Sequence, residues 1–282
     1  MKGFLIYLAK RYIAGTKKEH AIEAAKGLNQ EGLKATIDIL GENVTDGAEA
    51  EANVNEYIGL LEEIKASGVD STISLKLTHL GLDISEELAA ENLERILKTA
   101  RRLNNFVRVD MESSEYTDTT LRIFLGLHER YPNVGVAIQS YLLRSAGDME
   151  ILMEKGASVR LVKGAYREPP GVAFQSKSLV NSNFSDMMKV ILLKGARPAI
   201  ATHDSALIDE AVRFAGEKNI PNKKFEFQML LGISRKLQKR LAGAGFNVRV
   251  YVPYGKNWLP YVMRRLVERK ENIFFVARHI LD

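Results

Sequence analysis

The feature that most constrains the fold is a regular alternation of short apolar runs with longer amphipathic stretches. Each run has the length and β-branched content of a buried strand, and each is followed by apolar residues at helical spacing. Eight strand-then-helix units in a chain of 282 residues predict an α/β fold, a closed (β/α)8 TIM-type barrel. The strands are expected at 35–40, 72–77, 106–111, 134–139, 158–163, 198–202, 225–229 and 248–252.

Helices are expected between these strands, and Ser85 is expected to cap one of them through its side-chain oxygen. The expected helices cover 15–32, 48–65, 85–103, the region 121–127, 148–155, 183–193, the region 207–214, 235–240 and 261–268. We expect one domain over 1–282, with residues 1–33 as an extra N-terminal helical segment. The alternative is a doubly wound open sheet, which usually has a glycine-rich phosphate turn after its first strand. Gly41-Glu42-Asn43 lacks that pattern.

Composition narrows the class of protein. The absence of cysteine excludes disulfides and thiolate catalysis, and a net charge of +5 with mixed signs gives no strong case for nucleic acid. No apolar run approaches the roughly 18 residues of a membrane span. Residues 1–10 are expected to form an amphipathic helix and not a signal peptide, which predicts a cytoplasmic protein with peripheral contact at the inner face of the membrane.

Polar and ionisable residues gather where the predicted strands end. In a barrel enzyme these ends form one face, which carries the active site. A polar side chain in a buried strand is costly unless it is paired, so Asp38 and Glu226 also fit a structural role, paired to Lys or Arg inside the barrel. The residues at or near strand ends include Lys76, Asp110, Gln139, Arg160, Lys163, Thr202, His203, Gln228 and Tyr251.

The last predicted helix adds an arginine pair to this face. Tyr261, Arg264, Arg265 and Glu268 have the spacing of residues on one side of a helix. Two guanidinium groups there suit a carboxylate, and Lys163-Gly164-Ala165 suits the approach of a phosphate. The sequence shows neither a metal-ligand cluster nor a serine elbow, so a bound cofactor is expected to carry the chemistry. Spacing alone leaves aldolases and phosphate-binding isomerases open.

Four ordered motifs resemble those of the proline dehydrogenase family. They are Arg160-Leu161-Val162-Lys163-Gly164-Ala165-Tyr166, Ala201-Thr202-His203-Asp204, the segment 225–232, and the segment 249–255 followed by Arg264-Arg265-Leu266-x-Glu268. The resemblance runs from about Thr36 to the C-terminus, and it is to the short monofunctional bacterial type without DNA-binding or aldehyde dehydrogenase domains.

The resemblance implies noncovalent FAD, with L-proline as substrate and a membrane quinone as electron acceptor. Hydride transfer from proline C5 to flavin N5 would give Δ1-pyrroline-5-carboxylate, the first step of proline catabolism. The implied catalytic residues are Asp110 and Arg160. The implied substrate-binding residues are Lys76, Arg264, Arg265, Tyr166, Leu230, Tyr251 and Glu268. The implied cofactor-binding residues are Met111, Gln139, Arg160, Lys163, Gly164, Ala165, Thr202, His203 and Gln228. The alternatives are a flavin-binding sensor without turnover and a related barrel flavoenzyme acting on hydroxyproline or a folate.

Overall fold

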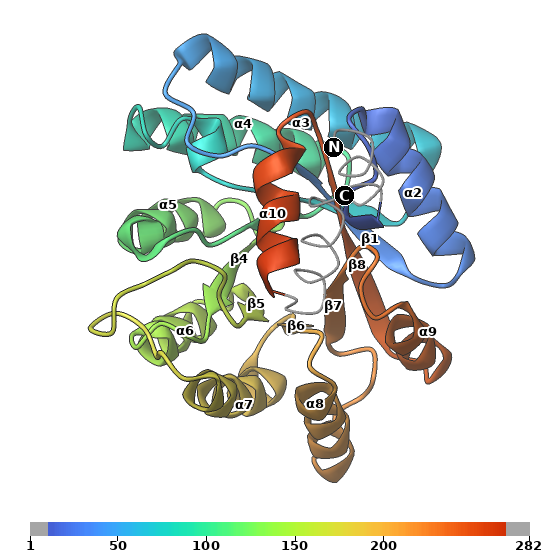
Figure 1. Cartoon of the computed structure of the whole chain (residues 1–282). Helices are drawn as coiled ribbons and strands as arrows, with labels where there is room; N and C mark the ends of the chain where they lie inside the picture. Colours follow the sequence, from blue (N-terminus) through green and yellow to red (C-terminus); the bar gives the residue numbers. More distant parts are fainter. Residues whose placement is uncertain (1–10, 269–282) are drawn as a thin grey trace, which may run out of the picture.

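The architecture is a closed barrel of eight parallel strands (Figure 1), as the alternation predicts. The computed structural model describes residues 11–268. Each strand pairs with the next in the chain, and β1 pairs with β8 to close the barrel. The strands are β1 (Lys34–Ile39), β2 (Ser71–Leu75), β3 (Val107–Val109), β4 (Val134–Gln139), β5 (Ser158–Val162), β6 (Ala199–Ala201), β7 (Glu226–Leu230) and β8 (Asn247–Tyr254).

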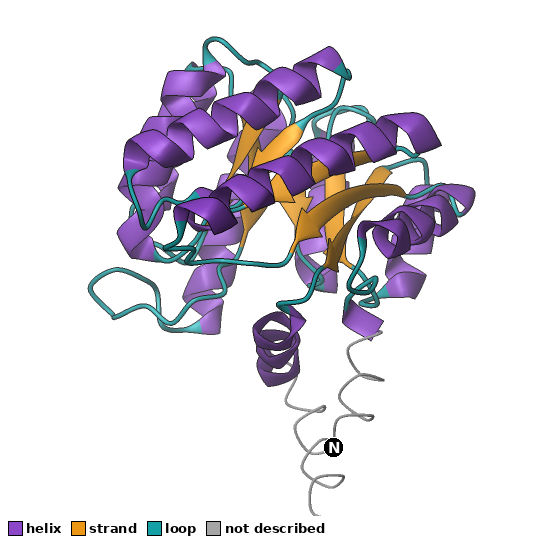
Figure 2. Cartoon of the chain, turned by 90° about the horizontal axis from the view of Figure 1, so that it is seen from above, coloured by secondary structure: helices purple, strands orange, loops and turns teal. Residues whose placement is uncertain are grey.

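A ring of helices surrounds the strands (Figure 2). The helices are α2 (Lys18–Gln30), α3 (Gly47–Ser67), α4 (Glu86–Arg102), α5 (Thr117–His128), α6 (Ser145–Glu154), α7 (Lys177–Lys194), α8 (Ser205–Glu217), α9 (Arg235–Gly243) and α10 (Trp258–Glu268), with 3-10 turns η1 (Thr78–Leu80) and η2 (Ser114–Tyr116). Ser85 caps α4 as predicted, because its hydroxyl accepts a hydrogen bond from the Leu88 amide at 3.1 Å. None of the helices within residues 11–268 has the length and apolar character needed to cross a bilayer.

Two helices depart from the simple ring. The N-terminal helix α2 packs against β1 and β8 and so covers the strand pair that closes the barrel. Helix α10, which follows β8, lies instead across the end of the barrel where the strands terminate (Figures 1 and 2). The sequence-predicted helix within residues 1–10 lies outside the described residues.

Four helix starts differ from the predictions by three or more residues, those of α2, α6, α7 and α10. Helix α7 was expected from residue 183 and begins at Lys177, because the Ser176 hydroxyl accepts a hydrogen bond from the Leu179 amide and starts the helix earlier. Helix α10 was expected after Pro260 and begins at Trp258. Proline is tolerated in the first turn, where backbone amides have no partner within the helix.

The barrel interior carries charged and polar side chains, while the layer between strands and helices is apolar. Buried residues of the apolar layer include Ile37, Ile73, Leu75, Phe124, Phe184 and Phe227. Buried polar residues of the strands include Thr36, Asp38, Ser74, Arg108, Arg160, Gln228 and Arg249. The predicted structural pairs are present, since Asp38 meets Lys76 at 3.7 Å and Glu226 meets Arg249 at 3.1 Å.

Candidate active site

A cavity of about 750 Å³ opens at the C-terminal end of the barrel, between the strand ends and α10. Its lining contains every sequence-predicted site residue except Glu268, which ends α10 and whose side chain lies outside the described part of the chain. The predicted residues that line it are Lys76, Asp110, Met111, Gln139, Arg160, Lys163, Gly164, Ala165, Tyr166, Thr202, His203, Gln228, Leu230, Tyr251, Arg264 and Arg265.

The inner wall is built around Asp110, which follows β3. Arg160 of β5 forms an ion pair with Asp110, and the Tyr251 hydroxyl donates to the other carboxylate oxygen at 2.8 Å. Arg160 is only 4% exposed, also donates to the Ser74 hydroxyl at 2.9 Å, and lies over the Tyr251 ring. The structure shows the ion pair with Asp110 and places Arg160 in the cavity wall.

A second ion pair lies beside the first. The Lys76 ammonium is 3.7 Å from the Asp38 carboxylate, whose residue is completely buried. Burial raises the pKa of Asp38 to about 6, although Lys76 opposes the shift. Burial by itself lowers the pKa of Lys76, but the attraction of Asp38 and Asp110 outweighs it and the net shift is upward. Lys76 therefore carries a positive charge into the cavity at any ordinary pH.

The rim contains the predicted arginine pair of α10. Arg264 forms an ion pair with Glu42, with donor–acceptor distances of 2.7 and 3.4 Å. Burial raises the pKa of Glu42, but the hydrogen bond and charge of Arg264, together with the charges of Lys76 and His79, outweigh it, so the pKa of Glu42 is lowered. Arg265 lies over the Tyr261 ring at 5.4 Å. Both guanidinium groups thus reach the same cavity, as the helical spacing predicts.

The opposite side of the cavity has the features of a phosphate site. Lys163 follows β5 and meets Asp204 at 2.7 Å, and Asp204 also caps α8 by accepting from the Ala206 amide at 3.2 Å. Burial raises the pKa of Asp204, yet the hydrogen bond and charge of Lys163, together with hydrogen bonds from the Ala206 and Leu207 amides, outweigh it and lower that pKa. Gly164 has a φ of +118°, and a Cβ there would lie 2.2 Å from the Tyr141 ring, so only glycine fits this turn.

His203 is held in one tautomer. Its Nε2 accepts a hydrogen bond from the Leu230 amide at 2.9 Å, so the ring proton is on Nδ1 in the neutral form. Thr202 is equally fixed, because its hydroxyl accepts from the Asp204 amide at 3.1 Å. Both residues precede α8, whose N-terminal dipole favours negative charge, such as the Asp204 carboxylate that caps it.

The remaining polar side chains are oriented by neighbours outside the cavity. Gln139 of β4 donates to the Glu112 carbonyl at 2.8 Å, and Gln228 of β7 donates to the Glu226 carboxylate. Tyr166 is half-buried, and the partial loss of solvent raises its pKa to about 12 and keeps its hydroxyl protonated. Rigid amide and phenol groups of this kind suit recognition of a flat, polar ring.

The main residues that sequence reasoning missed are the carboxylate partners. Glu42 lies three residues after the end of β1, close to the strand-end positions that were selected in the other strands, and Asp204 was part of a quoted motif but was given no role. The cavity lining also includes Lys177, Ser205 and Tyr261. Four cations of the site, Lys76, Arg160, Lys163 and Arg264, therefore each face one carboxylate. Within residues 11–268 no group of three or more His, Asp or Glu side chains is arranged to hold a metal ion.

Comparison with known families agrees with the motifs. Residues 21–278 match the family model described as proline dehydrogenase. The chain belongs to the proline dehydrogenase family. Among its relatives, proline dehydrogenase 1 of Bacillus subtilis subsp. natto is 42% identical over 273 residues, which cover 97% of this chain and 90% of that protein. The proline dehydrogenase of Deinococcus radiodurans is 38% identical over 279 residues, with the same coverage of 97% and 90%.

Solved structures of the family share the barrel. The proline utilization A protein of Bdellovibrio bacteriovorus, inactivated by N-propargylglycine, superposes with a TM-score of 0.89 and 26% identity. The match covers 95% of this chain and 33% of that protein, so the present barrel corresponds to one part of a longer chain. The full-length matches to the shorter bacterial relatives make this chain a member of the monofunctional group within the proline dehydrogenase family.

Proposed function

We propose that this protein oxidises L-proline to Δ1-pyrroline-5-carboxylate with FAD as its cofactor and a quinone as the electron acceptor. The proposal is supported by membership of the proline dehydrogenase family together with one observation. Positive charges reach one cavity from the residue after β2, from the loop after β5 and from α10, and they lie beside aromatic and apolar residues. The charged residues are Lys76, Lys163, Arg264 and Arg265. That combination suits a small amino acid with a carboxylate and an apolar ring.

The substrate carboxylate is assigned to Arg264, Arg265 and Lys76. Planar guanidinium groups bind a carboxylate through paired hydrogen bonds, and Lys76 adds a charge from the barrel wall. Binding would exchange the Glu42 carboxylate on Arg264 for that of proline. Tyr166, Leu230 and Tyr251 would pack against the pyrrolidine ring and exclude water from it.

The residues of the cavity fit a flavin nucleotide. Lys163, Gly164, Ala165, Thr202 and His203 would hold its ribityl and phosphate groups, since a glycine turn, a lysine and a helix N-terminus meet there. Met111, Gln139, Gln228 and Arg160 would contact its ring system. When bound, FAD would be the acceptor of the hydride from proline C5.

Asp110 and Arg160 are assigned to orient the reacting groups. Arg160 has a buried Nε without a partner among residues 11–268, which leaves a donor at the cavity wall. Asp110 holds Arg160 and the Tyr251 hydroxyl in fixed positions. The overall change is balanced when C5 loses a hydride and the amine nitrogen loses a proton, leaving a C=N bond in the ring.

The test of the function is the colour of the protein. The purified protein should show the absorption of oxidised flavin at about 450 nm, and L-proline added without oxygen or quinone should bleach this absorption. Retained colour after addition of L-proline would favour a sensor or another substrate. Bleaching by 4-hydroxyproline or a reduced folate alone would identify a related flavoenzyme.

We propose a cytoplasmic location with peripheral contact at the inner face of the membrane, where the quinone is found. In support, Leu259 and Met263 of α10 are exposed, on the helix that borders the cavity. Flotation with liposomes should carry the wild-type protein and less of a Leu259→Ser, Met263→Ser variant. Equal flotation of both proteins would reject this contact surface.

A further inference from the structure

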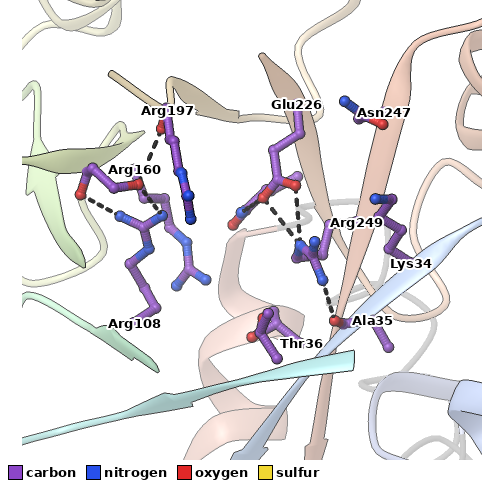
Figure 3. A network of polar contacts seen from close by, with 12 residues as sticks. Lys34, Ala35, Thr36, Arg108, Arg160, Arg197, Glu226, Asn247 and Arg249 are labelled. Atoms are coloured by element: carbon purple, nitrogen blue, oxygen red, sulfur yellow. Dashed lines mark hydrogen bonds and ion pairs between the residues drawn. The ribbon is translucent and has the colours of Figure 1, made fainter. Parts of the chain in front are cut away.

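A second cavity lies at the opposite, N-terminal end of the barrel. It has a volume of about 370 Å³ and is lined by residues at the starts of β2, β3, β5, β7 and β8 and before β6. Apart from Arg160, which lines both cavities, its charged side chains are Arg108, Arg197, Lys223, Lys224, Arg249 and Glu226. Figure 3 shows Arg108, Arg197, Glu226 and Arg249 around this space.

Arg108 is a buried cation whose contacts are all neutral. It is 5% exposed and donates to the Ser158 carbonyl at 2.5 Å, the Ser158 hydroxyl at 3.0 Å and the Val136 carbonyl at 3.3 Å. Within residues 11–268 no carboxylate forms an ion pair with it. Burial, with the nearby charge of Arg160, lowers the pKa of Arg108 to about 9.

The barrel makes room for this guanidinium. A Cβ at Gly135 would lie 2.3 Å from Arg108 Nη1 and 2.6 Å from the Ser158 carbonyl oxygen. Glycine at this point of β4 therefore allows a charged group to occupy the barrel interior. A buried charge is stabilised by a counter-charge, and Glu226 and Asp110 act on Arg108 only from beyond ion-pair distance.

The carboxylate of the cavity is already engaged. Glu226 accepts two hydrogen bonds of 3.1 Å from Arg249 and one from Gln228. The side chains of Lys223, Lys224 and Arg197 are exposed and make no hydrogen bond or ion pair with the described residues. Five cations and one carboxylate line the cavity, and Asp70 reaches Arg249 at 4.0 Å from outside the lining, so an excess of positive charge remains around this small space.

We propose that this second cavity is a binding site for a small polyanion of the phosphate class, either inorganic phosphate and pyrophosphate or a phosphate ester. A single carboxylate ligand would leave most of the excess charge in place, whereas a multiply charged oxyanion neutralises it. The guanidinium fork of Arg108 and the lysines at the mouth are the usual partners of phosphate oxygens. The inference is independent of the activity proposed above.

The experiment is a titration of the flavin-loaded protein by calorimetry at constant ionic strength set with chloride. The probes are inorganic phosphate, pyrophosphate and glycerol 3-phosphate. We expect saturable binding with one equivalent of at least one probe. Tighter binding of the inorganic probes would indicate free phosphate or pyrophosphate as ligand, and tighter binding of glycerol 3-phosphate would indicate an ester.

Two double variants with the same loss of charge provide the comparison. The Lys223→Ala, Lys224→Ala variant lacks two cations at the mouth of the cavity, and its dissociation constant for the phosphate probe should rise about tenfold or more. In Lys17→Ala, Lys26→Ala, two exposed lysines of the α2 region are removed instead, and the constant should change by less than about twofold. Turnover should stay at the wild-type level in both variants, which verifies folding.

Arg108→Met tests the buried group directly. It should abolish saturable binding while the protein retains its flavin and an unchanged dissociation constant for FAD. The proposal would be overturned if no probe bound saturably or if both double variants lost affinity equally. It would also be overturned if the probes released FAD, because the anion would then bind in the cavity at the C-terminal end of the barrel. If Arg108→Met does not fold, the paired double variants decide alone.

Discussion

At the scale of single residues, the site is a set of cations held by carboxylates from distant parts of the chain. Arg264 and Glu42 are 222 residues apart in sequence, and Arg160 and Asp110 are 50 apart. Such pairs fix the position of each guanidinium before a ligand arrives. Removing one member of a pair also leaves the other charge without its partner. Such a substitution therefore affects ligand binding and fold stability separately.

The Arg264–Glu42 pair gives the first prediction. Arg264→Met should raise KM for L-proline by about tenfold or more, because a charge-assisted contact to a desolvated carboxylate contributes roughly 2–5 kcal/mol. Glu42→Gln is the matched control: it keeps an acceptor for Arg264 and removes only the competing charge, so KM should not rise. Steady-state kinetics measure both. An unchanged KM in Arg264→Met would remove this arginine from the carboxylate site.

Arg160 gives the second prediction. Arg160→Met leaves the mostly buried Asp110 without its cation and should destabilise the fold by about 3–5 kcal/mol. It should also lower the flavin reduction potential by tens of millivolts, since about 30 mV corresponds to about 1.4 kcal/mol for a two-electron couple.

The double variant Arg160→Met, Asp110→Asn separates the two effects, because it removes the unpaired carboxylate. Its melting temperature should recover while its potential stays low. A wild-type potential in both variants would mean that Arg160 is structural only.

At the scale of elements, the strands were predictable and the helix ends less so. Strand positions follow from runs of apolar residues that must be buried on both faces, so prediction and structure agree within a few residues. The start of α7 was missed by six positions because a single hydroxyl, that of Ser176, decides it. That the listed residues line one cavity was predictable, because strand ends converge in any barrel. The partners Glu42 and Asp204 were not predicted, since pairing such as Arg264 with Glu42 depends on how elements lie in space.

Glu112 joins two such elements and gives a pH prediction. Its carboxylate accepts from the Thr78 amide of η1 at 3.1 Å and from the Thr78 hydroxyl at 2.5 Å. Burial raises the pKa of Glu112 from 4.5 to about 7 in the folded protein. A raised folded-state pKa stabilises the fold fully below the unfolded value of 4.5, and this contribution is lost as pH rises through 7.

Glu112→Gln should abolish that contribution while keeping an acceptor for Thr78. Thermal melts of both proteins between pH 4.5 and 8 should show the wild type losing more stability than Glu112→Gln as pH rises. His79 acts with the opposite sign, because burial lowers its pKa to about 4 and its contribution is lost as pH falls. Since His79 is present in both proteins, the difference between the two curves isolates Glu112. Parallel curves would contradict the prediction.

At the scale of the whole molecule, the apolar side chains form one main core and two smaller separate clusters. The main core runs around the barrel between strands and helices, and one of the smaller clusters joins α10 to Tyr12, Ile13, Leu40 and Ile233. Trp258, the single tryptophan of the sequence, packs against this α10 cluster. A small cluster at the barrel end buries less surface and should open at lower free energy than the barrel itself.

We therefore expect two midpoints in denaturant. Tryptophan fluorescence should change at a lower denaturant concentration than far-ultraviolet circular dichroism, because α10 undocks before the barrel unfolds. A Trp258→Phe, Phe227→Trp variant moves the reporter to the main core, and there the two signals should coincide. Coincident midpoints in the wild type would show that α10 and the barrel unfold together.

The pairing of β1 with β8 also has a consequence for synthesis on the ribosome. Residues 34–39 emerge early, but their partners at 249–254 are made more than 200 residues later. Until then the nascent chain has an open strand edge, and Glu42 lacks its ion-pair partner Arg264. A chain that stops before β8 therefore lacks Tyr251, Arg264 and Arg265 of the cavity lining, and its unpaired strand edge is a natural point of capture for chaperones.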